Sequence, residues 1–529
     1  MSPFDWSLPY PSRRQPVLAR NVVATSQPLA TQAGLSMLAR GGNAVDAAIA
    51  TAITLTVVEP VSNGIGSDLY AFVWDGRELV GLNASGRSPA AADPARHAGR
   101  DAMPQRGWEA VTIPGAVSGW VALSRRYGRL KFADLFEPAI RYARDGWIVS
   151  PVIAAQWRRA AGVIPHEFGW AEHFLPHGRT PNPGEAFACP PMARTLASIA
   201  ASGGESFYRG ELAATMAAHA QSYGARHTTE DFARHASDWV SPLSLDYRDA
   251  TVHEIPPNGQ GIAALQALGI LREFDLRGES PDSLPAQHRA IEAMKLAFAD
   301  AYAHVADREH MRVTPEALLD RGYLASRARL IDMKRAQDFG AGEPPRGGTV
   351  YLATGDADGT MVSLIQSNFM GFGSGVVVPG TGISLQNRGA GFVLAPGHPD
   401  EVGPRKRPYH TIIPGFLTRN GQPVMSFGVM GGDMQPQGHI QMIIRLVDYN
   451  QNPQSCADAP RWIVNHDMSV SLEEAVPAAV KEELKRRGHN VIPADRPMFG
   501  FGGAQLIHRV EDGYCAGTDP RKDGCAVGF

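Results

Sequence analysis

The chain has 529 residues, of which 44% are hydrophobic and 19% charged, so it can bury a large core as an ordinary globular protein. Its formal net charge is -3, with no run of five basic residues, which argues against nucleic acid and anionic membranes as partners. No apolar segment opens the chain as a signal peptide would, and none is long enough to span a membrane, so a cytoplasmic location is expected.

The four cysteines do not form a recognisable framework. None stands in a C-x-x-C pair, and no pair of histidines follows at the spacing of a zinc site. The H-E-x-x-H motif of a zinc-dependent hydrolase is also missing from the sequence. We therefore expect unreactive thiols, no metal and no cofactor. The cysteines are Cys189, Cys456, Cys515 and Cys525.

The first elements in chain order are a short strand and two helices. Residues 22–25 read Val-Val-Ala-Thr, which predicts a strand. Pro28 can open a helix that the glycine pair at 41–42 closes. Asn43 can then cap a second helix, and because that helix is apolar nearly all round, we expect it to be buried.

A hairpin and a long helical region follow. Residues 63–89 predict two strands joined by a turn at Asp75-Gly76. Residues 100–330 are mostly helical in pattern; within 292–307, for example, apolar residues recur at helical spacing. Residues 338–348 hold four glycines and two prolines, which indicates a linker or an exposed loop.

The last third of the chain is rich in predicted strands. Residues 349–394 form a series of strands with a hairpin turn at Asp358-Gly359. Further strands are predicted at 411–430 and 488–529, and helices at 437–450 and 474–487. A helix-rich first part followed by a strand-rich part fits an α+β fold in which helices cover two layers of sheet.

Three long segments resemble the γ-glutamyltranspeptidase family and occur in that family's order. They are residues 41–68, 345–392 and 428–441, with shorter matches at 111–120, 256–261 and 518–524. The resemblance implies a four-layer αββα sandwich of the N-terminal nucleophile hydrolase type. It also implies a precursor that cuts itself between Gly348 and Thr349. A large subunit, 1–348, and a small subunit, 349–529, would then stay associated as one composite domain.

The chemistry of Thr349 agrees with this role. A threonine at a chain terminus carries its own base, because its α-amine can take the hydroxyl proton. Cleavage after Gly348 would expose that amine, and the preceding small residues leave room for the hydroxyl to reach its own carbonyl. From the local sequence alone, Thr349 would be read as the first residue of an ordinary strand.

Two further positions carry catalytic roles in the resemblance. Gly431 and Gly432 match the glycine pair whose backbone N–H groups stabilise the oxyanion, where a glycine lets the substrate approach closely. Ser367 stands at the second hydroxyl of the family motif, which positions the nucleophile. The alternatives are a plain turn for the glycines and an ordinary strand serine for Ser367.

The predicted substrate site departs from the family pattern. Ser85 stands where the family has the arginine that binds the substrate α-carboxylate, and Arg87 follows two residues later. The family's N-x-M-D-D-F motif, whose acids hold the substrate amine, is replaced by a segment without either aspartate. That segment and one neighbouring residue complete the candidate substrate-binding residues: Gln386, Asn387, Arg388 and Asn368.

These features favour an amidohydrolase that cleaves a γ-glutamyl or related carboxylate-bearing acyl amide, with hydrolysis favoured over transfer. The carboxylate on the substrate is inferred from Arg87 and Arg388, because an arginine can bind a carboxylate through two hydrogen bonds. Alternatives are an acylase of the cephalosporin acylase or oxamate amidohydrolase kind, and a catalytically inactive binding protein of the same fold. Residues 371–375 could suggest a nucleotide-binding loop, but they lack the full glycine-rich fingerprint of such a loop. His410 is interpreted as a structural histidine. The expected partner is a small-molecule amide; the oligomeric state, including a homo-oligomer, is left open.

Overall fold

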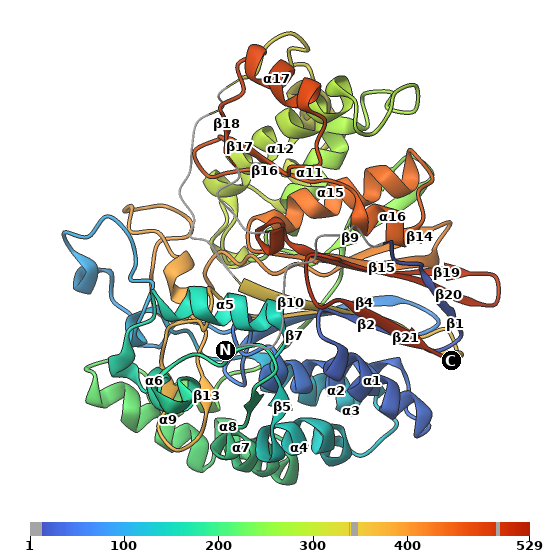
Figure 1. Ribbon diagram of the computed structural model, residues 1–529. Helices are drawn as coiled ribbons and strands as arrows, with labels where there is room; N and C mark the ends of the chain where they lie inside the picture. Colours follow the sequence, from blue (N-terminus) through green and yellow to red (C-terminus); the bar gives the residue numbers. More distant parts are fainter. Residues whose placement is uncertain (1–12, 338, 340–347, 494–497) are drawn as a thin grey trace.

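The computed structural model describes residues 13–337, 339, 348–493 and 498–529. Its centre is a pair of seven-stranded sheets that lie one above the other (Figure 1). The first sheet has the order β21-β2-β10-β11-β3-β4-β7. Its strands are β2 (Val22–Thr25), β3 (Asp68–Trp74), β4 (Leu79–Ala84), β7 (Asp238–Val240), β10 (Gly348–Gly355), β11 (Met361–Phe369) and β21 (Cys525–Gly528).

The second sheet has the order β1-β20-β19-β15-β14-β9-β8. Its strands are β1 (Val17–Ala19), β8 (Leu243–Tyr247), β9 (Ala250–Glu254), β14 (Gly415–Arg419), β15 (Gln422–Met430), β19 (Gly503–Val510) and β20 (Gly513–Thr518). Aromatic and aliphatic side chains from both sheets form one buried cluster between them, which includes Tyr70, Phe72, Tyr351, Ile412 and Phe416.

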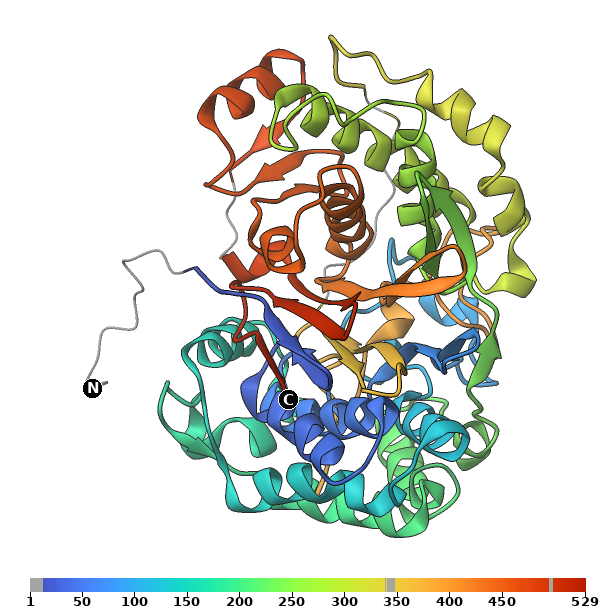
Figure 2. The same cartoon turned by 90° about the vertical axis from the view of Figure 1, so that its right-hand side faces the viewer.

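Helices pack on the outer face of each sheet. Against the first sheet pack α1 (Pro28–Ala39), α2 (Ala44–Val58) and α3 (Ala116–Tyr127), and beyond them lie α4 (Glu137–Asp145), which packs on α2, and α7 (Pro190–Ser202), which packs on α4. Against the second pack α11 (Gly261–Leu271), α15 (Met434–Val447) and α16 (Pro453–Asp458), and α12 (Leu284–His304) packs on α11 beyond them. Both views show these two groups of helices on opposite sides of the sheets (Figures 1 and 2). No helix in the described part of the chain is long and apolar enough to cross a membrane.

The predicted elements of the first hundred residues are confirmed. Asn43 caps α2 through its side chain, which accepts from the N–H groups of Val45 and Asp46. The Asp46 carboxylate completes the capping box, and every side chain of α2 is buried, as its apolar composition predicts. The turn between β3 and β4 places Gly76 at φ 94°, where glycine is favoured.

Later elements differ from the sequence predictions in places. Most of the predicted loop 338–348 lies outside the described residues. After β11, the run predicted as strands up to 394 contains only the two-residue strands β12 (Val377–Val378) and β13 (Ile383–Ser384). The helix expected from 437 begins at Met434. The strands β16 (Trp462–Val464) and β17 (Val470–Leu472) were not predicted; they form a three-stranded sheet with β18 (Val491–Ile492), which lies in the predicted strand region 488–529, and α17 (Ala478–Arg486) confirms the helix predicted at 474–487.

Strands from the two ends of the sequence alternate within the first sheet. β10 pairs with β2 on one side and with β11 on the other, and β11 pairs in turn with β3. β21, at the end of the chain, lies beside β2 (Figure 2). Residues before and after position 348 therefore share one hydrophobic core.

Candidate active site

Thr349 lies at the beginning of β10 and on the inner face of the first sheet. Side chains alternate along a strand, and Tyr351 and Ala353 of β10 belong to the cluster between the sheets. The pairing of β10 with β11 shifts register between Gly348 and Val350, so a β-bulge surrounds Thr349. Such bulges commonly redirect a side chain beside an active site.

The Thr349 hydroxyl is held by two side chains. Its Oγ1 lies 3.1 Å from Ser367 Oγ, and Gln435 Nε2 donates to it over 3.4 Å. Ser367 Oγ in turn accepts from the N–H of Phe369 (2.7 Å). Gln435 is fixed because its Oε1 accepts from Ile413 N–H (2.9 Å). Thr349 is only 2% exposed, so its hydroxyl is positioned in a site that largely excludes water.

The predicted oxyanion glycines lie between β15 and α15. Gly431 has φ 133° and Gly432 has φ 62°, both in the region that favours glycine. Neither N–H donates to an acceptor within the described part of the chain, whereas their carbonyls accept from Met434 and Gln435. Gln260 Nε2 also donates to the Gly432 carbonyl (3.0 Å). The backbone is therefore held through its carbonyl groups while both N–H groups stay available.

Arg388 is a fully buried cation with no carboxylate bound to it among the described residues. Its Nη1 donates to Thr411 Oγ1 (2.7 Å), and its guanidinium carbon lies 4.4 Å from the centre of the Phe369 ring. Its Nε and Nη2 have no partner within that same set. Burial lowers the pKa of Arg388 to about 9, against the opposing effect of the Asp68 charge, so the guanidinium is charged at neutral pH. A buried charge of this kind is energetically costly unless an anion pairs with it.

Arg388 and Thr349 are linked through neighbouring groups. Phe369, beneath the guanidinium, donates its N–H to Ser367, which contacts Thr349. On the other side, Gln260 Nε2 donates to the carbonyl groups of both Thr411 (2.7 Å) and Gly432 (3.0 Å). The cation, the hydroxyl pair and the glycine pair therefore belong to one site.

Asp68 adds a buried carboxyl group to the same end of the sheet. It is the cross-strand partner of Ser367. Its Oδ2 accepts from His410 Nε2 (3.1 Å), and its Oδ1 accepts from the N–H groups of Gly86 (3.2 Å) and Gly115 (3.1 Å). Burial raises the pKa of Asp68 to about 7, opposed mainly by Arg388. His410 is buried and hydrogen-bonded, as the structural interpretation predicts, and burial lowers its pKa.

Three of the predicted substrate-binding side chains are engaged within the protein. Asn368 accepts from Ser67 Oγ and donates to Ser384 Oγ. Gln386 donates to Thr112, and Asn387 donates to the carbonyl of Gln105. Gln386 Oε1 also accepts the Arg388 N–H. These contacts frame the turn that carries Arg388, η7 (Arg388–Gly391), and leave direct substrate contact by these three side chains a prediction.

Ser85 and Arg87 have different surroundings. Ser85 is buried; its Oγ accepts from Tyr70 OH (3.2 Å) and donates to Asn83 Oδ1 (2.8 Å). The Arg87 side chain is 36% exposed and pairs with Asp307 at 2.6 Å. It lines a separate cavity of about 210 Å³ whose lining does not include Thr349 or Arg388. Among the described residues, Arg388 is the one of the two arginines whose contacts lead through Phe369 and Ser367 to Thr349.

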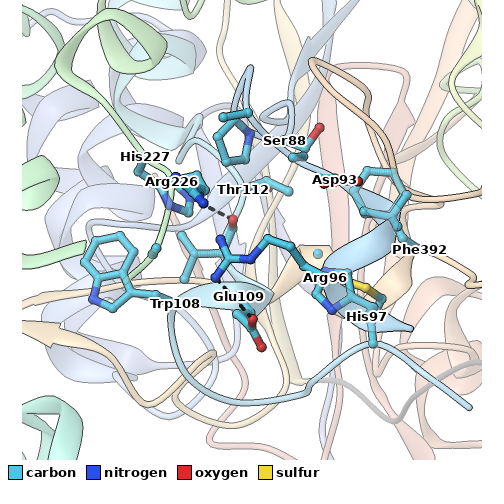
Figure 3. A pocket seen from close by; sticks show the side chains of 18 residues that line it. Ser88, Asp93, Arg96, His97, Trp108, Glu109, Thr112, Arg226, His227 and Phe392 are labelled. Carbon is cyan, nitrogen blue, oxygen red and sulfur yellow. Dashed lines mark hydrogen bonds and ion pairs between the residues drawn. The ribbon is translucent and has the colours of Figure 1, made fainter. Parts of the chain in front are cut away.

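A second cavity lies behind the Arg388 turn. Figure 3 shows Arg96 and Glu109 pointing toward one another in it, with Trp108 and His227 to one side. Gly389 contributes to its lining. Its volume of about 60 Å³ suits a few water molecules rather than an acyl amide.

Sequence reasoning missed several residues of the site. Gln435 lies inside a segment that carried the resemblance, but only its contact across the two sheets shows its role. Asp68 likewise closes the resemblance segment 41–68 without being singled out, and Thr411 lies outside the three long segments. Residues 371–375, weighed as a nucleotide loop, instead pack closely: a Cβ on Gly373 would lie 2.2 Å from the Leu385 carbonyl oxygen. No group of metal-ligating side chains occurs in the described ranges.

Comparisons with known proteins identify the family of this chain. The Gamma-glutamyltranspeptidase family matches residues 30–529. The chain is 35% identical to the glutathione hydrolase-like YwrD proenzyme of Bacillus subtilis, covering 96% of this chain and 98% of that protein. It is 36% identical to the oxamate amidohydrolase proenzyme of Klebsiella pneumoniae, covering 95% and 97%. A crystal structure of cephalosporin acylase from Bacillus halodurans superposes with a TM-score of 0.95 at 47% identity, covering 100% and 99%. The chain therefore belongs to the γ-glutamyltranspeptidase family.

Proposed function

We propose that this chain is the precursor of an N-terminal nucleophile amidohydrolase that activates itself by cleavage before Thr349. The observation that carries the proposal is the position of the Thr349 hydroxyl, which Ser367 and Gln435 hold in place. Thr349 directly follows Gly348 in the chain. Two facing sheets with helices on both outer sides fit the αββα sandwich of this class. The "proenzyme" names of the similar proteins support a processed chain of two associated subunits, 1–348 and 349–529.

Self-cleavage would proceed through an ester. Thr349 Oγ attacks the Gly348 carbonyl carbon, and the peptide C–N bond breaks as the proton moves to the departing nitrogen. The product is an ester between Gly348 and the Thr349 hydroxyl oxygen, with a free α-amine on Thr349. Water then hydrolyses the ester, leaving a carboxylate on Gly348 and restoring the hydroxyl.

In turnover, the freed amine would act as the base. It accepts the hydroxyl proton while Oγ attacks the substrate carbonyl, then donates a proton to the departing amine. The N–H groups of Gly431 and Gly432 are the donors available to the developing oxyanion. Water completes the cycle by hydrolysing the acyl ester on Thr349.

We infer from Arg388 that the acyl group carries a carboxylate. Two of its nitrogen atoms lack a partner among the described residues, and a carboxylate can accept from both at once. The absence of both family aspartates argues against an α-ammonium on the substrate. We propose that hydrolysis is favoured over transfer. Acylase activity is the second candidate, because the chain superposes so closely on the cephalosporin acylase.

The test compares the wild type with Thr349→Ala. We expect the wild type to separate under denaturing conditions into residues 1–348 and 349–529, and the variant to stay intact and inactive. The cleaved enzyme is then assayed with matched amides whose acyl groups carry a terminal carboxylate or a neutral methyl ester. Cleavage of the variant at the same bond would refute the role of Thr349. Preference for neutral acyl groups would refute the carboxylate, and failure of the wild type to cleave would favour an inactive binding protein.

A further inference from the structure

A fully buried carboxyl–imidazole pair joins the second sheet to α15. Glu254 ends β9, and His439 lies in the second turn of α15. His439 Nδ1 lies 2.6 Å from Glu254 Oε1, and neither side chain is exposed. Each polar group would cost free energy if it were buried alone, so the two stabilise one another. The pair therefore holds α15 against the sheet, although the catalytic steps proposed above use neither residue.

His439 shares one face of α15 with Gln435, because residues four positions apart lie one turn apart on the same side of a helix. Gln435 Nε2 donates to Thr349 Oγ1 (3.4 Å), and its Oε1 accepts from Ile413 N–H (2.9 Å). The pair with Glu254 holds the same face one turn further along. The rotation of α15 about its axis, which sets where the Gln435 side chain begins, is therefore fixed beside Thr349.

Glu254 also lies against the beginning of α11, which packs beside α15 on the second sheet (Figure 1). A Cβ on Gly261, the first residue of α11, would lie 2.9 Å from Glu254 Oε2. The N–H groups at the beginning of a helix carry partial positive charge, which favours a carboxylate at this position. Gln260, the residue before Gly261, donates through Nε2 to the Gly432 carbonyl (3.0 Å). One carboxyl group therefore lies between the segment that holds the glycine pair and the helix that contacts the Thr349 hydroxyl.

We propose that Glu254 and His439 are positioning residues that keep Gln435 in contact with the Thr349 hydroxyl, without touching the substrate themselves. The inference rests on the proposed function. Because the pair acts through Gln435, its loss should matter only while that side chain is present. A displaced hydrogen-bond donor at the nucleophile should lower kcat by about three- to tenfold. KM should change little, because neither residue has a hydrogen bond or ion pair with Arg388 in the described part of the chain.

The test is a double-mutant cycle on the processed enzyme. Glu254→Met/His439→Leu replaces both polar groups together, so that no unpaired charge is left buried. This pair variant, Gln435→Ala and the combination of the two are compared with the wild type in kcat and KM for the carboxylate-bearing amide. Rates are divided by the amount of cleaved enzyme, determined from intact mass. Gly261→Ala is a second way to displace Glu254, because the added Cβ would lie 2.7 Å from the Glu254 Cβ.

The matched control loosens the other end of the same helix. Asp448 follows the last residue of α15, and its carboxylate pairs at 2.8 Å with Arg248, which directly follows β8. Arg248→Met/Asp448→Asn removes this contact between α15 and the second sheet but leaves Gln435 and His439 untouched. Its melting temperature shows how far α15 can be destabilised without an effect on kcat.

We expect the pair variant and Gly261→Ala to lose about three- to tenfold in kcat, and the control to match the wild type. In the Gln435→Ala background, the pair variant should change kcat by less than about twofold. A pair variant with wild-type kcat, or losses that multiply in the combined variant, would overturn the proposal; if the pair variant does not fold, Gly261→Ala decides in the same way. An equal loss in the control would also overturn it, because general loosening of α15 would then explain the effect. A wild type that does not turn over the amide would instead overturn the proposed function.

Discussion

Replacing Arg388 with methionine tests which of the two arginines, Arg87 or Arg388, binds the carboxylate of the substrate. Methionine fills a similar volume but removes the charge and the hydrogen bond to Thr411. A hydrogen bond to a charged group contributes about 1.5–3 kcal/mol, and about 1.4 kcal/mol changes a rate tenfold. We therefore expect kcat/KM for a carboxylate-bearing acyl amide to fall by about 10- to 100-fold, with little change for its methyl ester.

Thermal unfolding of the same variant distinguishes lost binding from lost folding. A buried guanidinium without a bound carboxylate destabilises the fold, so its removal should leave the melting temperature unchanged or higher. The matched substitution is Arg87→Met, at a partly exposed residue paired with Asp307. It should leave kcat/KM nearly unchanged. A large loss in Arg87→Met with none in Arg388→Met would refute the assignment.

Three further substitutions test the site. Ser367→Ala should slow self-cleavage and turnover about tenfold, because it removes a hydrogen bond to Thr349, and Ser367→Thr should restore most of the rate. Equal rates in the wild type and both variants would contradict a role for this contact. Gly432→Val places a β-branched residue at φ 62° and should lower kcat by about 10²–10³; an intact kcat would argue against the oxyanion role. Asp68 has its pKa raised from 3.8 to about 7 by burial, so the folded state binds its proton more tightly and stability falls as pH rises across that interval. Asp68→Asn should flatten this dependence, measured as melting temperature from pH 4 to 8; an unchanged profile would contradict it.

Parts of the fold around Thr349 follow from local sequence alone. The turn at Asp358-Gly359 fixes the hairpin, and counting outward from it places Ser367 opposite Thr349. The register shift beside Thr349 leaves the two hydroxyls 3.1 Å apart. The cap of α2 at Asn43 could be predicted for the same reason, since its partners lie within three residues.

The remaining contacts depend on how distant segments pack. Gln435 reaches Thr349 from the start of α15, and Arg388 meets Thr411 across a turn that the pattern predicted as strand. Such contacts join residues far apart in sequence, so no periodicity or spacing reports them. The sequence left Arg87 and Arg388 as equal candidates because their difference lies in burial and in Asp307, both properties of the folded chain.

The most direct test of the central claim is the intact mass of the purified wild-type protein under denaturing conditions, together with the N-terminal residue of any smaller species. Self-cleavage before Thr349 predicts two polypeptides, the shorter beginning at Thr349 and ending at Phe529. Only this cut supplies the α-amine that the hydroxyl needs as its base. A single species of 56.8 kDa in protein that turns over an amide substrate would contradict the proposed mechanism.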